Sequence, residues 1–271
     1  MVHAVRETPR DYTQFGLSDT EVARYRRDGF LLVRQVFDNV YVTTVRDAFD
    51  RMHQKSQSLA DTSEIDGSLY VIGPPQAKSS FKTATLRVVW AGGDEPILDT
   101  LGSHPRLLAI ASAVLGSNSL MQLINQAHFK HPYDGVDFPW HQDSRHRRQG
   151  TELFTDLDGM GSFVETLTAI DPMTPNNGPL EVLIGSHKEG HLENFQDHLP
   201  RLLTTYQQHT VEMNPGDVLL CSPFIVHQSL VNTGSQSRYV FLNGFALPGA
   251  SRRIYPGCGL GRLRQISSNT V

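Results

Sequence analysis

Residues 214–247, NPGDVLLCSPFIVHQSLVNTGSQSRYVFLNGFAL, decide the fold. Apolar runs rich in Val, Leu, Ile and Phe alternate here with short turn segments, a pattern typical of β-strands. The Pro-Gly-Asp of residues 215–217 predicts a turn before the first run, and residues 232–235 (NTGS) predict a hairpin turn before the last one. We therefore expect antiparallel β-structure in this part of the chain.

The strand pattern begins well upstream of this stretch, near residue 120. Further β-rich segments, separated by Gly, Pro and Asn, are LMQLINQAHFKH (120–131), GSFVETLTAI (161–170) and QHTVEMN (208–214). Most of the second half of the chain is therefore predicted to form strands.

The first part of the chain has the period of helices instead. Ser18 and Glu21 fit a capping box, and Gly29 is expected to end that helix before a buried strand, FLLV. A second helix is predicted over roughly 39–57 and a third over 104–116, HPRLLAIASAVLG. The apolar stripe of the second helix is Val42, Val45, Phe49 and Met52.

Residues 58–85 are polar, contain a Gly-Pro-Pro sequence and show no clear period. We expect a long irregular connection, which is uncommon inside a compact domain. Such a segment serves either as a lid or binding loop, or as a surface loop without function.

Helices followed by many strands predict one α+β domain over residues 1–271. Its architecture is expected to be a double-stranded β-helix, that is, a jelly-roll or cupin-like barrel, with flanking N-terminal helices. The helical part spans about 17–116, the barrel core about 118–248 and a C-terminal tail 249–271.

Composition excludes several classes of protein. With 24 Lys and Arg against 28 Asp and Glu, the formal charge is −4, which disfavours a nucleic-acid-binding protein. Cys221 and Cys258 are too few for a disulfide scaffold or a cysteine-based zinc site, and we expect free thiols. Residues 1–12 have no apolar segment, so we expect no secretory leader, and no run reaches the roughly 18 apolar residues of a membrane helix. We expect a cytoplasmic protein without membrane contact, and its oligomeric state stays open.

A metal site is indicated by FPWHQDSRHRRQG, residues 138–150. His141 and Asp143 are two residues apart, so on a strand they point to the same face. An imidazole and a carboxylate supply two of the three ligands of a common iron site. Two other His-x-Glu triplets lie in IGSHKEGHLEN (184–194), a polar, Gly-punctuated segment that is poorly suited to rigid ligation.

His227 lies in an apolar strand, where it is either a core histidine satisfied by a backbone carbonyl or the third ligand. A hairpin centred between Thr233 and Gly234 places Ser229 opposite Arg238, on the face of His227. A buried arginine without an acidic partner favours a carboxylate ligand. The pattern predicts a small dicarboxylate beside a metal.

Together these segments resemble the phytanoyl-CoA dioxygenase family of iron(II)- and 2-oxoglutarate-dependent oxygenases, over nearly the whole chain. LSDTEVARYRRDGFLLVRQVF (17–37) resembles the N-terminal helix and strand of the family, and FPWHQD (138–143) resembles its metal motif. NNGPLEVLIGSHKEGHL (176–192) resembles its Asn-Gly-Pro-Leu and Gly-Ser-His signature. NPGDVLLCSPFIVHQSLVNTGSQSRYV (214–240) resembles its second-histidine strand.

The resemblance implies that His141, Asp143 and His227 bind iron(II). It also implies that Ser229 and Arg238 hold the distal carboxylate of 2-oxoglutarate, the cosubstrate. Dioxygen would be the third reactant, and succinate and carbon dioxide the co-products. The implied reaction is hydroxylation of an unactivated C–H bond in a small molecule.

Further residues are assigned less directly. The family adds a polar side chain from the strand before the metal motif, for which Gln126 is our candidate, with Asn125 and Thr168 as alternatives. Arg145 follows the metal motif at the same parity and is expected to pair with an acidic or zwitterionic substrate. Alternatively, the whole charged run is a solvated loop face. Three more polar residues are expected at strand edges or in loops rather than as metal ligands, namely His128, Lys130 and His131.

The substrate itself is not given by the sequence. Residues 144–148 (SRHRR) stand where family members carry an aromatic residue, so the resemblance does not fix the specificity. An amino-acid-derived or specialised metabolite, modified for biosynthesis, is expected. The alternatives are desaturation or cyclisation by the same iron chemistry, a non-oxidative cupin-type metal enzyme, and a jelly-roll binding module.

Overall fold

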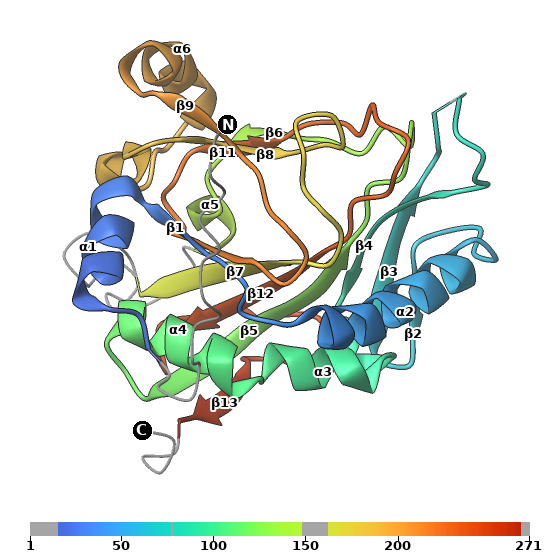
Figure 1. Ribbon diagram of the computed structural model, residues 1–271, viewed down its shortest axis with the longest axis horizontal. Coiled ribbons are helices and arrows are strands. Elements are labelled where there is room, and N and C mark those ends of the chain that lie inside the picture. The colour runs from blue at the N-terminus through green and yellow to red at the C-terminus, as the bar shows by residue number, and fades with distance from the viewer. Residues whose placement is uncertain (1–15, 77, 148–161, 267–271) are drawn as a thin grey trace, which may run out of the picture.

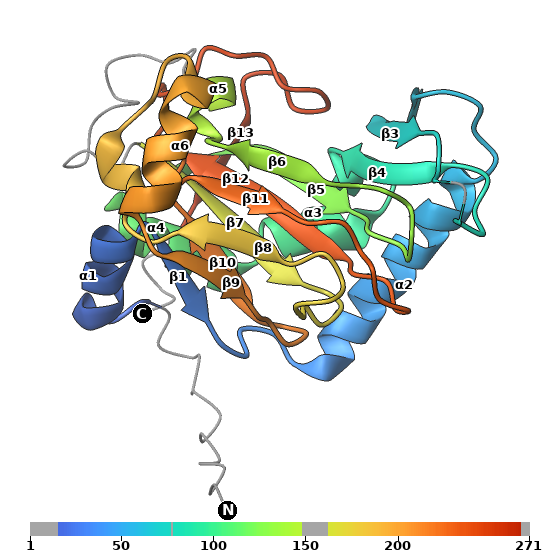
Figure 2. The same ribbon diagram turned by 90° about the horizontal axis from the view of Figure 1, so that it is seen from above.

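The computed structural model describes residues 16–76, 78–147 and 162–266, in which two antiparallel β-sheets face each other (Figures 1 and 2). The larger sheet has the order β1 (Phe30–Val33), β10 (Val218–Cys221), β7 (Phe163–Ala169), β12 (Val240–Ala246), β5 (Ser119–His128), β4 (Ala84–Val89), β3 (Ser68–Gly73) and β2 (Ser63–Ile65), with β13 (Arg262–Gln265) beside β5. The smaller sheet has the order β6 (Phe138–His141), β11 (His227–Ser229), β8 (Leu180–Leu183) and β9 (Gln208–Val211).

Side chains of the larger sheet alternate between two environments, as the pleat requires. On β10, Leu220 packs in the cluster that joins the sheet to the helices, whereas Leu219 and Cys221 pack in the cluster that faces the smaller sheet. On β12, Phe241 belongs to the first cluster and Val240 to the second. Both faces of this sheet are therefore covered, and the inner face looks onto the smaller sheet.

Helices cover the outer face of the larger sheet (Figure 1). They are α1 (Asp19–Asp28), α2 (Asn39–Ser56), α3 (Pro96–Gly102) and α4 (Pro105–Leu115), with the 3-10 turn η1 (Ala91–Gly93) before α3. Three of them confirm the predicted helices. Ser18 and Glu21 form the predicted capping box of α1, and Gly29 ends that helix with a φ of 82°. The buried face of α2 includes Val42, Val45, Phe49 and Met52, as predicted.

Residues 58–85 are not an irregular connection, so that prediction is wrong. They contain β2, β3 and the start of β4, which extend the larger sheet. Asp66 and Gly67 link β2 to β3 with φ values of 51° and 79°, as in a two-residue hairpin turn. The Asp-Gly pair is a strong hairpin signal. The hairpin was missed because β2 is short and mostly polar, so only residues 69–72 of β3 show an apolar strand-like run.

The stretch 214–247 contains β10, β11 and β12, but β11 and β12 do not pair with each other. β11 pairs with β6 and β8, whereas β12 pairs with β5 and β7. The predicted hairpin centred between Thr233 and Gly234 is therefore wrong, and this connection crosses from one sheet to the other. β11 is short because a turn precedes it, in which Ile225 N donates to Ser222 O over 3.1 Å.

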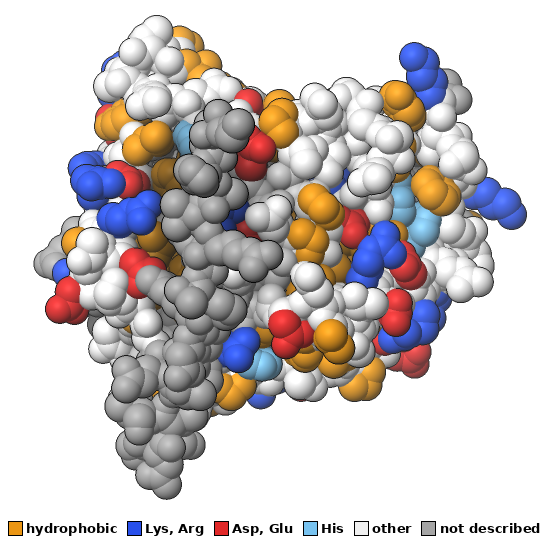
Figure 3. Space-filling view, viewed as in Figure 1, with side chains coloured by type: hydrophobic (Ala, Val, Ile, Leu, Met, Phe, Trp, Pro, Cys, Tyr) orange, Lys and Arg blue, Asp and Glu red, His pale blue; other side chains and the backbone are white. Residues whose placement is uncertain are grey.

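In the part of the chain that the structure describes, the other helical elements are α5 (Ser144–Arg147), η3 (Ser186–Glu189) and α6 (Phe195–Thr205). Cys221 and Cys258 are free thiols, as expected. Within the described ranges, no helix combines the length and the apolar character needed to cross a membrane. On the face shown in Figure 3, the coloured acidic and basic side chains are interspersed rather than gathered by sign.

Candidate metal centre

Two histidines from distant parts of the sequence lie next to each other across the smaller sheet. His141 is the last residue of β6 and His227 the first of β11, and they are paired in the antiparallel register. Their ring centroids are 4.2 Å apart. Strand pairing therefore fixes the separation of the two imidazoles.

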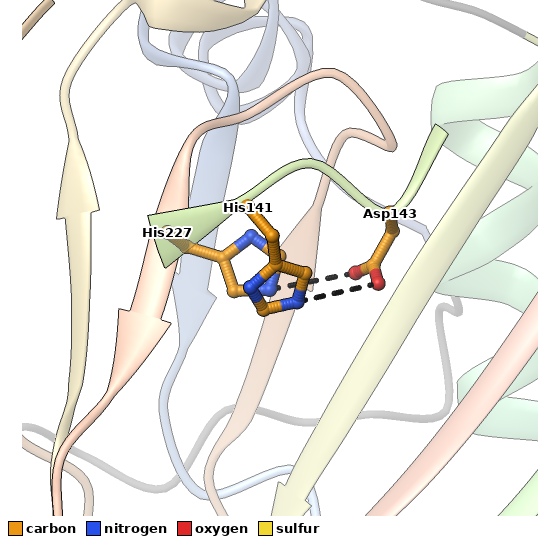
Figure 4. Close-up of side chains that lie close together, drawn as sticks. All are labelled: His141, Asp143 and His227. Atoms are coloured by element: carbon orange, nitrogen blue, oxygen red, sulfur yellow. Dashed lines mark ion pairs between the residues drawn. The ribbon is translucent and has the colours of Figure 1, made fainter. Parts of the chain in front are cut away.

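Asp143 completes the group, but from a turn rather than from the strand. β6 ends at His141, and Asp143 lies between it and α5, so the expected common strand face is wrong. The turn nevertheless brings its carboxylate to both rings (Figure 4). Asp143 Oδ1 is 3.7 Å from His141 Nε2, and Oδ2 is 3.5 Å from His227 Nε2.

The backbone sets the orientation of both rings. His141 Nδ1 is 2.7 Å from Pro139 O, and His227 Nδ1 is 3.1 Å from Ile225 O. A neutral imidazole that donates from Nδ1 presents an unprotonated Nε2, which is the form that binds metals. Burial, followed by repulsion from His141, lowers the pKa of His227 to about 4, so this ring is neutral near pH 7.

The three side chains together fit an iron(II) ion. Each offers one ligand atom, and these atoms lie within 4.8 Å of one another. Two imidazole nitrogens and one carboxylate oxygen, with further coordination positions open, are the donor set of non-haem iron(II) oxygenases.

Gln142 ties the Asp143 turn to its surroundings, a role that the sequence did not indicate. Its Nε2 donates to Phe224 O over 2.7 Å and to Gly190 O over 2.8 Å, and its Oε1 accepts from Leu192 N over 3.0 Å. These three bonds join the turn to the two segments that flank it. The sequence carries no signal for this role, because the three partners are backbone groups from distant parts of the chain.

The donor group lines a cavity of about 450 Å³ between the two sheets. Side chains of both sheets form its walls, including Phe138 and Leu180 of the smaller sheet and Glu165, Leu167, Val240 and Leu242 of the larger one. Both walls are rigid strands, so the cavity is preformed.

Arg238 lies in the same cavity wall, in the connection that leads to β12. It is only 4% exposed, and its Nη2 donates to Ser229 Oγ over 2.9 Å and to Gly178 O over 2.7 Å. Its Nε has no hydrogen-bond partner among the described residues. Burial lowers the pKa of Arg238 to about 10, which leaves it charged at neutral pH. The sequence placed Ser229 beside Arg238 through a hairpin, whereas the structure does so through the crossing connection.

Lys130 lies two residues beyond the end of β5 and is buried against the same connection. Its Nζ donates to Ser229 O over 3.1 Å and to Leu230 O. Burial and then the charge of Arg238 lower the pKa of Lys130 to about 6. An anion in this part of the cavity would stabilise the charge of Arg238 and favour protonation of Lys130.

Three residues were candidates for the polar side chain that the family adds to the cosubstrate site, namely Gln126, Asn125 and Thr168. Of these, only Gln126 lines the cavity. Its Oε1 is 3.0 Å from Nε2 of His128, the next residue on that face of β5. Asn125 points to the opposite face, where its Nδ2 donates to Leu98 O over 2.9 Å. Thr168 is buried on β7 and points to the face opposite that of Glu165 and Leu167, which line the cavity. Asn125 and Thr168 are therefore wrong as candidates.

Arg145 lies in α5, is exposed and lines the mouth of the cavity. The side chain of Arg147 and residues 148–150, the rest of the charged run, lie outside the described residues. His187 and His191, of the two other triplets, do not belong to the donor group. His187 Nε2 is 3.0 Å from Arg26 O. His191 Nδ1 is 2.8 Å from the hydroxyl of Ser144.

Comparison with known sequences gives one family. The profile described as Phytanoyl-CoA dioxygenase (PhyH) matches residues 25–240. The ectoine dioxygenase of Bordetella bronchiseptica is 30% identical over 176 residues, 64% of this chain and 50% of that protein. The L-proline trans-4-hydroxylase of Streptomyces griseoviridis is 27% identical over 164 residues, 51% of this chain and 58% of that protein. The chain thus spans about half the length of these curated relatives.

Solved structures agree in fold. EctD from S. alaskensis with bound Fe superposes with a TM-score of 0.70 at 20% identity, over 95% of this chain and 85% of that chain. The α-ketoglutarate-dependent carbocyclase SnoK from nogalamycin biosynthesis gives a TM-score of 0.66 at 19% identity, over 93% of this chain and 97% of that chain. The predicted α+β jelly-roll fold is confirmed.

Proposed function

Because the chain belongs to the phytanoyl-CoA dioxygenase family, whose cofactors are iron(II) and 2-oxoglutarate, we propose that it is an oxygenase that hydroxylates an unactivated C–H bond of a small molecule. One observation carries the proposal: a single cavity is lined by an iron-type ligand set and by a buried guanidinium whose Nε has no hydrogen-bond partner among the described residues. A non-oxidative metal enzyme would have no use for Arg238, and a binding module would need neither feature.

His141, Asp143 and His227 would hold the iron(II) ion. The bonds from the two Nδ1 atoms to backbone carbonyls aim both Nε2 lone pairs at the side of the carboxylate before any metal binds. When bound, iron(II) and 2-oxoglutarate supply the oxidant, with dioxygen consumed and succinate and carbon dioxide released.

Arg238 and Ser229 would hold the distal carboxylate of 2-oxoglutarate. The Nε–H of Arg238, which has no hydrogen-bond partner among the described residues, is a charge-assisted donor. The Ser229 hydroxyl accepts from Arg238 and still has its own proton to donate. The amine of Lys130 lies behind them and donates to Ser229 O. Gln126 would contribute an amide to the same pocket from β5.

A small substrate follows from the size of the cavity, since about 450 Å³ must accommodate 2-oxoglutarate as well. The relatives named for ectoine and for L-proline support a small, amino-acid-derived compound. Arg145, at the cavity mouth, would pair with an acidic or zwitterionic group of that compound.

The test is a screen of small amino-acid derivatives for succinate release under air, repeated with ¹⁸O₂ on any compound that is turned over. Hydroxylation predicts succinate together with a product that contains one labelled oxygen atom. Succinate with an unlabelled, oxidised product would instead indicate desaturation or cyclisation. If the iron-loaded protein neither consumes 2-oxoglutarate nor binds it, the oxygenase proposal is wrong.

A further inference from the structure

Arg87 lines the cavity but has no role in the site described so far. Arg87 lies on β4, opposite His128 of β5, and His128 is in turn opposite Val240 of β12. These three residues form a row across the inner face of the larger sheet, and all of them line the cavity. Arg87 therefore defines the wall of the cavity on the β4 side.

Among the described residues, no carboxylate or carbonyl is paired with the guanidinium of Arg87, although it is half-buried. Three cationic side chains that also line the cavity have such partners. Arg238 and Lys130 donate to the carbonyls described above, and Arg253 donates to His146 O over 2.6 Å. A guanidinium withdrawn from water without hydrogen-bond acceptors is costly. Burial accordingly lowers the pKa of Arg87.

The neighbours of Arg87 do not neutralise it. His128 is the closest titratable group across the strand pair, and burial, followed by the charge of Arg87, lowers its pKa to about 3. A neutral imidazole leaves the local charge positive. The acidic residues of the cavity wall, Asp143 and Glu165, come from the metal turn and from β7, which is separated from β5 by β12. The cavity is therefore polarised, with its β4 side positive.

We propose that Arg87 binds a carboxylate of the organic substrate, so that the substrate is a small organic acid with its acid group on the β4 side of the cavity. This inference rests on the proposed function, because it assigns 2-oxoglutarate to Arg238. A planar guanidinium fork matches a carboxylate bidentately. Arg87 is on β4, Arg238 lies in the connection that leads into β12, and β4 and β12 flank β5, so the two backbones are about two strand spacings, or roughly 10 Å, apart. The two arginines thus serve two different anions.

The test compares small carboxylic acids, cyclic amino acids included, with their primary amides. Binding to the full chain is measured by calorimetry in the presence of 2-oxoglutarate and without oxygen, for the wild type, Arg87→Gln and Arg87→Lys. Arg24→Gln, a change at an exposed residue of α1, is the matched control. The dissociation constant of 2-oxoglutarate is measured for every variant.

We expect some acids to bind the wild type and Arg24→Gln more tightly than their amides do. Arg87→Gln should weaken the binding of these acids by about tenfold or more, to the level of the amides, and Arg87→Lys should recover part of the loss. Binding of 2-oxoglutarate should stay unchanged. The inference is overturned if no acid binds more tightly than its amide, or if Arg87→Gln weakens the binding of 2-oxoglutarate and not that of the acids. If Arg87→Gln does not fold, the wild type and Arg87→Lys provide the test: the ratio of the dissociation constants of amide and acid should be smaller in Arg87→Lys than in the wild type, and an equal ratio would overturn the inference. Failure of the proposed function would appear separately, as absent binding of iron(II) or 2-oxoglutarate.

Discussion

His141 and His227 face each other across β6 and β11, and each is anchored through Nδ1 to the carbonyl two residues earlier in its own chain segment. The two rings are thereby held in the same tautomer and aimed at the same point. Side chains fixed in this way lose little conformational entropy when a metal binds. The strand pair therefore prepares the site, and the turn that carries Asp143 closes it.

Gln142 is predicted to matter for metal affinity although it offers no ligand atom. Gln142→Leu removes three hydrogen bonds that hold the Asp143 turn and leaves buried backbone groups without partners. We expect iron(II) affinity to fall by about 10- to 100-fold. Competition with a fluorescent chelator measures it. Gln208→Leu, at an exposed position of β9, should leave the affinity unchanged, and equal losses in both variants would contradict this role.

Arg238→Leu is predicted to affect the cosubstrate much more than the metal. Removing a buried cation from a carboxylate site costs about 3 kcal/mol, so the 2-oxoglutarate requirement should rise by about 100-fold. Iron(II) affinity should be mostly retained, because none of the three proposed iron ligands, His141, Asp143 and His227, is hydrogen-bonded to Arg238. The readouts are titration of 2-oxoglutarate against succinate release and iron content. An unchanged requirement would remove Arg238 from the site.

Arg145→Ala is predicted to have a smaller effect, confined to the substrate. An exposed ion pair at the cavity mouth contributes about 1 kcal/mol or less, so KM for an acidic substrate should rise by roughly twofold to fivefold. KM for 2-oxoglutarate should not change. Steady-state kinetics with the substrate found by the screen separates the two values. If neither value changes, the charged run is only a solvated face.

His131 is predicted to make the protein less stable in acid. It is buried beside His53, with ring centroids 3.8 Å apart, and burial lowers the pKa of His131 to about 3. The unfolded chain therefore binds a proton that the folded chain excludes between about pH 6.5 and 3. Stability from this group is complete above pH 6.5 and falls as the pH decreases, by up to about 1.4 kcal/mol per pH unit. Urea unfolding at several pH values measures the free energy of unfolding. Its dependence on pH should be flatter for His131→Phe than for the wild type, whereas His209→Phe, an exposed control, should follow the wild type.

Local sequence signals predicted α1, α2 and α4, because the caps and apolar stripes that define them lie within or next to each helix, whereas α3, α5 and α6 were not predicted. Ser18, Glu21 and Gly29 mark both ends of α1, and the stripe of α2 is complete. The hairpin of β2 and β3 had a signal too, in Asp66 and Gly67, but the short and mostly polar β2 before it showed no strand pattern. Local capping signals were therefore sufficient for α1 and α2, whereas the local turn signal of the β2–β3 hairpin was not.

Strand pairing was harder to predict, because the partner of a strand lies elsewhere in the chain. The run around His227 reads equally well as one arm of a hairpin with β12, yet β11 pairs with β6 and β8. Ser229 still contacts Arg238, since the crossing connection brings them together. The side chains that only tertiary packing reveals, such as Gln142, Lys130 and Arg87, carried no local signal. Motif spacing found the donor group, and packing determined what surrounds it.

The most direct test of the iron site is anaerobic titration of the metal-free protein with iron(II) in the presence of 2-oxoglutarate. A visible charge-transfer absorption should report the two binding together, with one iron(II) per chain. Asp143→Ala is predicted to lose this absorption and the coupled release of succinate, whereas Asp61→Ala, at an exposed residue before β2, should keep both. Near-normal absorption and turnover in Asp143→Ala would contradict the assignment of His141, Asp143 and His227 as the iron ligands.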